Sequence, residues 1–294
     1  MYDALIIGRG PAGISCAIYT ARANLKTLVI GLFGSSLVKA DKVENYYGFE
    51  MPIGGKELLI AGEKQAKRLG AEIIDEEIVN IEKADHFKVT TTKNIYEAHT
   101  VLLATGSPNI KAPVKKIDKF EGSGVSYCTV CDGFFYRNKK VGVLGYTDYA
   151  VHEAMELLPF TSDITIFTNG MPLKLSDENQ KELSRFSINT EKIAELYGGE
   201  NLEGILFEDG RKQELSGLFV AYGSASSISF ALKMGIMTDG KSILVNDKME
   251  TNIPGLYAAG DCTGVFKQIS VAVGQGAIAS RQMIETVRKM RKDG

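Results

Sequence analysis

The sequence lacks tryptophan and is poor in cysteine and histidine, with 4 Cys and 3 His among 294 residues. So few cysteines do not make the disulfide framework of a small secreted protein. Two of them form one C-x-x-C, but a structural zinc site needs a second pair, so we expect no bound metal. No apolar run approaches the roughly 20 residues that span a bilayer, and the start Met1-Tyr2-Asp3 lacks the basic residues of a signal peptide. We therefore expect a cytoplasmic protein with no membrane segment.

The chain also lacks a strong excess of either charge. The formal net charge is −2, which argues against a general nucleic-acid binder. Residues 112–240 are acidic, with 13 Lys and Arg against 18 Asp and Glu, whereas the flanking segments together have 21 against 18. Hydrophobic residues make up 44% and charged residues 24%, the composition of a globular protein. At roughly 150 residues per domain, the length suggests two domains.

The hydrophobic pattern predicts two β-α-β units. We expect strands at 2–8, 25–30, 77–81, 87–92, 95–99, 101–104, 141–145, 164–167, 202–207, 212–215, 218–222 and 256–259, and helices at 11–23, 56–69, 149–158 and 268–289. Asp209-Gly210 indicates a hairpin between two of these strands. Strands that alternate with helices favour an α/β fold with parallel sheets.

A glycine-rich loop opens the first unit. Gly8, Gly10 and Gly13 form G-x-G-x-x-G between a buried strand and a helix. In this context the first glycine makes the tight turn, the second admits a pyrophosphate, and the third allows helix and strand to pack closely. The helix N-terminus then offers its free N–H groups to the diphosphate. The acidic residue expected about 20 positions on is absent, because Gly31 ends the next strand.

The corresponding loop of the second unit departs from this pattern. Gly145 begins it, but Thr147 stands where the second glycine belongs, and Asp148 adds a negative charge. Residues 167–170 contain no acid for the 2′-hydroxyl of NAD and no arginine for the 2′-phosphate of NADP. These features predict a Rossmann-like domain that no longer holds a nicotinamide nucleotide.

Cys128 and Cys131 form the C-x-x-C and precede the second unit. Cysteines at this spacing close a reversible disulfide and often have a depressed thiolate pKa. Asp132 follows directly, in a position that suits a helix-cap residue. The residues alone leave open a reduced buried pair or half of a metal site.

Together these segments resemble the low-molecular-weight thioredoxin reductases, in which Cys-x-x-Cys-Asp-Gly-Phe-Phe begins the second domain. The resemblance covers nearly the whole chain, including the family's V-E-N-Y segment. It implies two Rossmann-like three-layer dinucleotide-binding domains, the second inserted in the first. It also implies FAD as cofactor, held by Gly8, Gly10, Pro11, Ala12, Gly13, Asn45, Ile78, Ala104, Thr105, Gly106, Gly260, Asp261, Lys267, Gln268 and Ile269. The family usually has arginine at the position of Lys267.

Because the nicotinamide motifs are missing, the chain resembles most the ferredoxin-dependent flavin thioredoxin reductases. That resemblance implies transfer of electrons from ferredoxin through FAD and the dithiol to thioredoxin, in a homodimer. Cys131 would face the flavin, Cys128 would attack the partner disulfide, and Asp132 would handle the proton. The FAD domain would comprise residues 1–111 and 241–294, and the redox domain residues 112–240.

Three alternatives remain open at this point. The first is an NADPH-dependent thioredoxin reductase with an unusual nucleotide loop. The second is an FAD-dependent oxidase of a small dithiol. The third is a non-catalytic FAD-binding partner protein.

Overall fold

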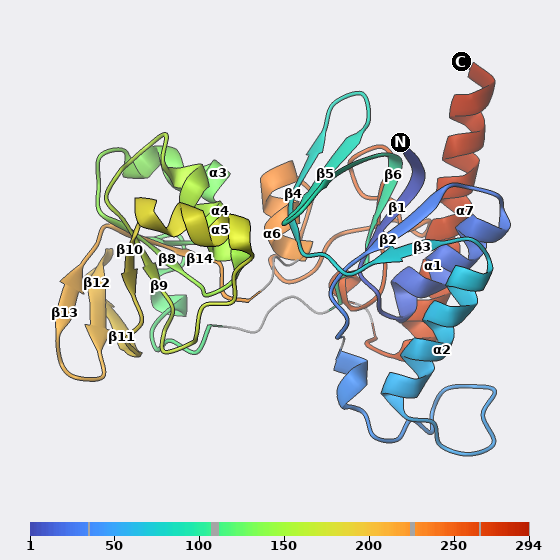
Figure 1. Ribbon diagram of the computed structural model, residues 1–294, viewed down its shortest axis with the longest axis horizontal. Coiled ribbons are helices and arrows are strands. Elements are labelled where there is room, and N and C mark those ends of the chain that lie inside the picture. Colours follow the sequence, from blue (N-terminus) through green and yellow to red (C-terminus); the bar gives the residue numbers. More distant parts are fainter. Residues whose placement is uncertain (35, 107–111, 224–226, 265, 294) are drawn as a thin grey trace. The chain divides into compact units, whose positions relative to one another are not determined.

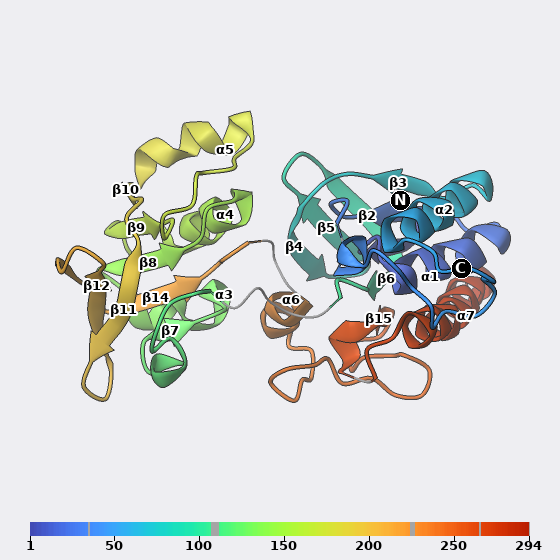
Figure 2. The same cartoon turned by 90° about the horizontal axis from the view of Figure 1, so that it is seen from below.

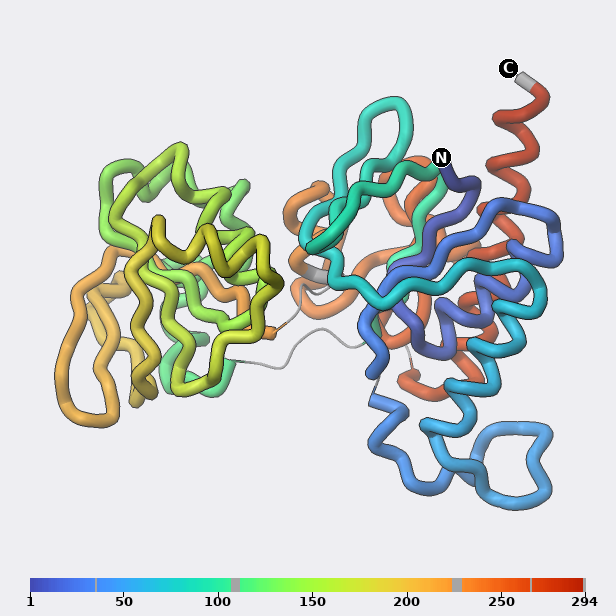
Figure 3. Tube along the Cα trace, viewed as in Figure 1, coloured from blue at the N-terminus to red at the C-terminus, as the bar shows by residue number. Residues whose placement is uncertain are grey.

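The computed structural model describes residues 1–34, 36–106, 112–223, 227–264 and 266–293. The chain forms two compact units, one of residues 1–108 with 226–294 and one of residues 109–225. Both chain ends, blue and red in Figure 3, therefore belong to the same unit, and the second unit is inserted in the first. The first domain boundary expected from the sequence, after residue 111, falls on a residue outside the described part of the chain. Residues 227–240 lie in the first unit instead of the second, because helix α6 (Ser227–Met234) packs against strand β4.

The first unit is built on a seven-stranded sheet in the order β3-β2-β1-β6-β5-β4, with β15 also paired to β6. The strands are β1 (Tyr2–Ile7), β2 (Thr27–Ile30), β3 (Glu72–Ile74), β4 (Ile78–Lys83), β5 (Phe87–Thr91), β6 (Ile95–Leu103) and β15 (Leu256–Ala258). The pairs among β3, β2, β1, β6 and β15 are parallel, and β4-β5-β6 is an antiparallel meander.

Strand β6 replaces the two strands that the sequence predicted at 95–99 and 101–104. Its first half pairs with β5, and its second half pairs with β1 and β15. Only Thr100 lies between the two predicted strands. The strand continues through Thr100 because this residue pairs with Ala4 of β1. Its buried hydroxyl donates a hydrogen bond to the carbonyl oxygen of Asp3 (2.7 Å).

Three helices lie side by side on one face of the parallel strands (Figures 1 and 2). They are α1 (Pro11–Arg22), α2 (Gly55–Arg68) and α7 (Ile269–Asp293). Helix α1 packs on both others, and a buried cluster joins its Ile14 and Ala17 to Ala279 and Met283 of α7. None of the helices in the described part of the chain has the length and hydropathy that a membrane span requires.

The second unit repeats the pattern with a five-stranded parallel sheet in the order β10-β9-β8-β14-β7. Its strands are β7 (Val125–Ser126), β8 (Val141–Leu144), β9 (Ile164–Phe167), β10 (Ser187–Asn189) and β14 (Gly217–Val220). Its helices are α3 (Thr129–Asp132), α4 (Asp148–Leu157) and α5 (Asp177–Glu182). Side chains alternate between two cores, so that Val143 packs on the α4 side and Leu144 on the opposite side.

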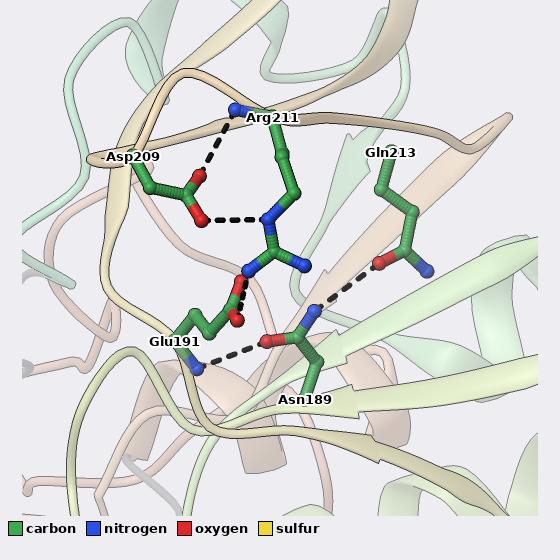
Figure 4. Close-up of polar contacts among 5 residues, drawn as sticks. All are labelled: Asn189, Glu191, Asp209, Arg211 and Gln213. Carbon is green, nitrogen blue, oxygen red and sulfur yellow. Dashed lines mark hydrogen bonds and ion pairs between the residues drawn. The ribbon is translucent and has the colours of Figure 1, made fainter.

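An antiparallel sheet of β11 (Ile193–Gly198), β12 (Leu202–Phe207) and β13 (Lys212–Glu214) contributes to that opposite core. The predicted hairpin turn is confirmed, with Gly210 at φ 86°. The Asp209 carboxylate accepts hydrogen bonds from the backbone N–H of Arg211 (2.9 Å) and from its guanidinium (2.6 Å). Arg211 also pairs with Glu191, which ties the turn to the segment after β10 (Figure 4). The two-domain Rossmann-like fold expected from the sequence is thereby confirmed.

The approach of α7 to α1 depends on Gly276, because a Cβ there would lie 2.1 Å from the carbonyl oxygen of Ala12. We expect Gly276→Ala to destabilise the protein by about 1–3 kcal/mol through this overlap. Gly274 lies two residues earlier on α7 with open space around it. Gly274→Ala should therefore stabilise the helix, by up to about 1 kcal/mol. Urea unfolding followed by circular dichroism measures both, and equal effects of the two substitutions would contradict the packing argument.

Candidate functional site

The glycine loop between β1 and α1 has the geometry that a bound diphosphate requires. Gly8 has φ +116°, and a Cβ there would lie 2.2 Å from the carbonyl oxygen of Ala104 at the end of β6. A Cβ on Gly13 would lie 2.0 Å from the carbonyl oxygen of Gly8, so this position holds helix and strand together. At Gly10, in contrast, a Cβ would meet nothing within 4 Å. The middle glycine thus faces open space at the N-terminus of α1, where no side chain caps the helix.

The end of β15 lies against the same helix N-terminus. Gly260 has φ +85°, and its Cβ position is 3.1 Å from the Cβ of Ala12. The Gly260 N–H donates to the side chain of Gln275 on α7 (2.8 Å), which also contacts the Thr263 hydroxyl. Asp261 follows at the start of a 3₁₀ turn, Asp261–Thr263. Gln275 is a residue that sequence reasoning missed, since no local pattern relates it to a glycine 15 positions earlier.

Asn45 and Gln268 come together from segments 223 residues apart. The Asn45 amide donates to the side-chain oxygen of Gln268 (2.8 Å), immediately before α7 begins at Ile269. Lys267 beside them is exposed. Ile78 is buried at the start of β4, in register with Thr91. The structure thus joins the expected residues in two groups, one around the glycine loop with Ala104 and Gly260 and one of Asn45 with Gln268.

The end of β2, where Gly31 replaces the expected acidic residue, lies next to Arg9. The Arg9 guanidinium donates to the Gly31 carbonyl oxygen (3.2 Å) and forms two hydrogen bonds with the Glu63 carboxylate (2.9 and 3.0 Å). Asp75 lies 3.1 Å from the same guanidinium. Charged groups thus surround the end of β2 although the strand itself ends in glycine.

The turn between β8 and α4 in the second unit has the same backbone contacts as the glycine loop. A Cβ on Gly145 would lie 2.2 Å from the carbonyl oxygen of Ala221, just as Gly8 lies against Ala104. Thr147 occupies the position equivalent to Gly10, and its hydroxyl donates to the Gly223 carbonyl oxygen (2.7 Å). The side chain of Thr147 therefore spans the space that remains open in the first unit.

Further contacts tie this turn to the segment after β9. The Lys174 N–H donates to the Tyr146 carbonyl oxygen (2.8 Å). The buried Asp148 carboxylate accepts from the Ser176 N–H (2.9 Å) and from the Asn179 amide (2.8 Å). Asp148 thus holds the beginning of α5.

Cys128 and Cys131 form a disulfide at the start of α3. Cys128 is 3% exposed, whereas Cys131 is exposed. The backbone N–H of Cys131 donates to the Cys128 sulfur (3.2 Å). Hydrogen bonding of this kind favours a thiolate when the disulfide opens. Cys16 and Cys262 are buried, and burial raises the pKa of the Cys16 thiol, so these two cysteines belong to the core.

Asp132 is held beside the disulfide by Ser126. The Ser126 hydroxyl donates to the Asp132 carboxylate (2.6 Å) and accepts from the Cys128 N–H (3.1 Å). Asp132 also lines a cavity of about 890 Å³ together with Tyr136 and Lys139. Burial, and secondarily the Asp132 carboxylate, raises the pKa of Tyr136. The hydrogen bond from Ser126 thus fixes the Asp132 carboxylate beside the redox turn, and the cavity gives it access to solvent.

A dinucleotide-binding unit joined to a second unit with a C-x-x-C disulfide defines the class of flavin-dependent disulfide oxidoreductases. The comparisons with known proteins agree. Residues 2–276 match the family described as pyridine nucleotide-disulphide oxidoreductase. The chain therefore belongs to the pyridine nucleotide-disulphide oxidoreductase family, and it is of the thioredoxin reductase type.

Individual relatives span nearly the whole chain. An atypical thioredoxin reductase from Desulfovibrio vulgaris Hildenborough is 41% identical with a TM-score of 0.93, over 97% of this chain and 98% of that one. A ferredoxin-flavin thioredoxin reductase from Clostridium acetobutylicum is 34% identical with a TM-score of 0.72, over 98% of both chains. A thioredoxin reductase from Aquifex aeolicus is 35% identical over 95% of this chain and 91% of its own.

FAD is the cofactor of this chain, and the open position at Gly10 fits its diphosphate. We expect Gly10→Ala to reduce the flavin bound per chain while the fold is retained, because the added methyl group would occupy the path of the diphosphate. Gly54→Ala is the matched control. Gly54 is also the N-cap of a helix, and the nearest atom to its Cβ position is 3.7 Å away. Flavin absorbance per protein measures both variants, and equal flavin content would contradict the role of Gly10.

Proposed function

We propose that the protein reduces thioredoxin with electrons from reduced ferredoxin, through FAD and the Cys128–Cys131 disulfide. This proposal rests on the side chain of Thr147, which donates a hydrogen bond to the Gly223 carbonyl oxygen in the second unit. The equivalent position in the first unit is Gly10, which leaves space for a diphosphate. With Asp148 hydrogen-bonded to the start of α5, a nicotinamide nucleotide would have to displace both contacts. An electron donor other than a nicotinamide nucleotide is then required.

A ferredoxin has the chemistry that this donor needs. FAD, when bound, accepts electrons singly and delivers them as a pair. A plant-type ferredoxin near −400 mV and a thioredoxin near −270 mV differ by about 130 mV. For two electrons this is roughly 6 kcal/mol in the direction of thioredoxin reduction. The relative from Clostridium acetobutylicum, which is named for both ferredoxin and flavin, supports the same donor.

The two cysteines have different parts in the proposed reaction. Two electrons and two protons open the disulfide to two thiols, with the exposed Cys131 as the sulfur that faces the flavin. The Cys128 thiolate attacks one sulfur of the thioredoxin disulfide, which forms a mixed disulfide and releases the other sulfur as a thiol. Cys131 then attacks Cys128, which closes the original disulfide and releases the second thioredoxin thiol. Asp132, fixed by Ser126 and open to the cavity, supplies and removes the protons.

The remaining assignments follow from the same proposal. We infer that the first unit holds FAD and that the second carries the redox disulfide. The flavin would contact the glycine loop and the strand ends at Ala104–Gly106 and Gly260–Asp261. It would also contact the hydrogen-bonded pair of Asn45 and Gln268. The homodimer and the cytoplasmic location stay predictions, which light scattering and cell fractionation would test.

Anaerobic titration of the flavin tests the electron donor. We expect reduced ferredoxin to bleach the flavin absorbance within the mixing time, whereas NADPH and NADH leave it unchanged over minutes. Fast bleaching by NADPH would overturn the proposed donor and identify an NADPH-dependent enzyme. Oxygen consumption with a small dithiol, without thioredoxin turnover, would identify a dithiol oxidase instead.

Single cysteine variants test the order of the thiols. We expect Cys131→Ser to trap a stable mixed disulfide through Cys128 with a thioredoxin that lacks its own resolving cysteine. Cys128→Ser should form at least about tenfold less, since its remaining thiol faces the flavin. Non-reducing electrophoresis and mass spectrometry identify the linked residue. A complex formed mainly through Cys131 would reverse the assignment.

A further inference from the structure

A buried carboxylate that the proposed mechanism does not use lies beneath the redox turn. Glu153 of α4 is 2% exposed, although glutamate is among the residues least often buried. A buried carboxylate must be hydrogen-bonded to be tolerated. The hydroxyl of Thr129 donates to Glu153 Oε2 at 2.6 Å, within the range of a charge-assisted O–H···O⁻ bond.

The donor connects Glu153 directly to the disulfide. Thr129 follows Cys128 and is the first residue of α3, inside the C-x-x-C itself, and it is 1% exposed. Its hydrogen bond to Glu153 connects the redox turn to α4. On the other side, Ser126 fastens the turn to Asp132 (2.6 Å). The redox turn is thus held by two hydroxyl–carboxylate pairs, one facing the cavity and one in the interior.

We propose that Glu153 is a positioning residue for the Cys128–Cys131 pair: through Thr129 it holds the turn in the geometry of the disulfide, and its negative charge lowers the thiolate fraction of the reduced pair. The inference rests on the proposed function only in that the pair is redox-active. Opening the disulfide takes two electrons and two protons and leaves two thiols. A negative charge close by in a region of low dielectric disfavours a second one on sulfur.

Two titratable groups next to the redox turn and Glu153 along the chain have contacts of their own. Asp132 is bonded to Ser126, and His152 lies 3.8 Å from Glu156, one turn further along α4. Glu156 is one turn from Glu153 on the same helix, but its side chain is 38% exposed. It therefore provides a matched control in which the same charge is removed from the same element without changing the interior.

The test uses the full-length flavoprotein, reduced and then freed of reductant without oxygen. In Glu153→Gln the amide oxygen still accepts from Thr129 while the charge is lost. We expect Cys128 to react with iodoacetamide at pH 7 about tenfold faster, equivalent to one unit in thiol acidity. At a fixed ratio of reduced to oxidised glutathione, less of the pair should be in the disulfide form. Glu156→Gln should match the wild type in both measurements.

A second pair of variants keeps the proposal testable if Glu153→Gln does not fold. Thr129→Val removes the hydroxyl and should lower the disulfide fraction at the same glutathione ratio, because the turn is no longer fastened. Thr129→Ser keeps the hydroxyl and should have the same disulfide fraction as the wild type. The proposal is overturned if Glu153→Gln behaves like Glu156→Gln, or if Thr129→Val and Thr129→Ser are equal. None of these measurements requires ferredoxin or thioredoxin, so they are independent of the identity of donor and acceptor.

Discussion

Each unit of this protein depends on one close approach between a glycine and the carbonyl oxygen of a neighbouring strand. Gly8 lies against Ala104, and Gly145 lies against Ala221. In both pairs a Cβ added to the glycine would lie 2.2 Å from the carbonyl oxygen of the alanine. Because no side chain intervenes, the first strand can turn directly into the helix that covers the sheet. The strand ends, the helix N-terminus and the residues that follow them are then gathered at one edge of each sheet.

The same turn serves two purposes in one chain. In the first unit Gly10 leaves the helix N-terminus accessible, and the surrounding segments converge on it from β6 and β15. In the second unit Thr147 and Asp148 use the equivalent positions for hydrogen bonds within the protein. The hydrogen bonds around the disulfide of the second unit are made instead by Ser126 with Asp132 and Cys128, and by Thr129 with Glu153.

Much of this arrangement could be predicted from the sequence, because the main strands and helices have strong apolar periodicity and the glycine spacing identifies the turns. The prediction was wrong where it divided β6 at Thr100, since pairing of Thr100 with Ala4 of β1 decides the outcome there. Short elements such as β7 and β10 were missed because they depend on pairing with β14 and β9. The contributions of Gln275, Ser126 and Glu153 could not be predicted, since each acts through a contact between elements and belongs to no recognisable motif.

The contacts around Thr147 also bear on how such a domain changes over evolutionary time. Each of them fastens the turn to Gly223, Lys174 or the start of α5, so each adds to the stability of the fold. Replacing Thr147 or Asp148 by glycine would remove its side-chain contacts and weaken the domain. A glycine loop at this turn would therefore need other contacts, or a bound ligand, to recover the lost stability.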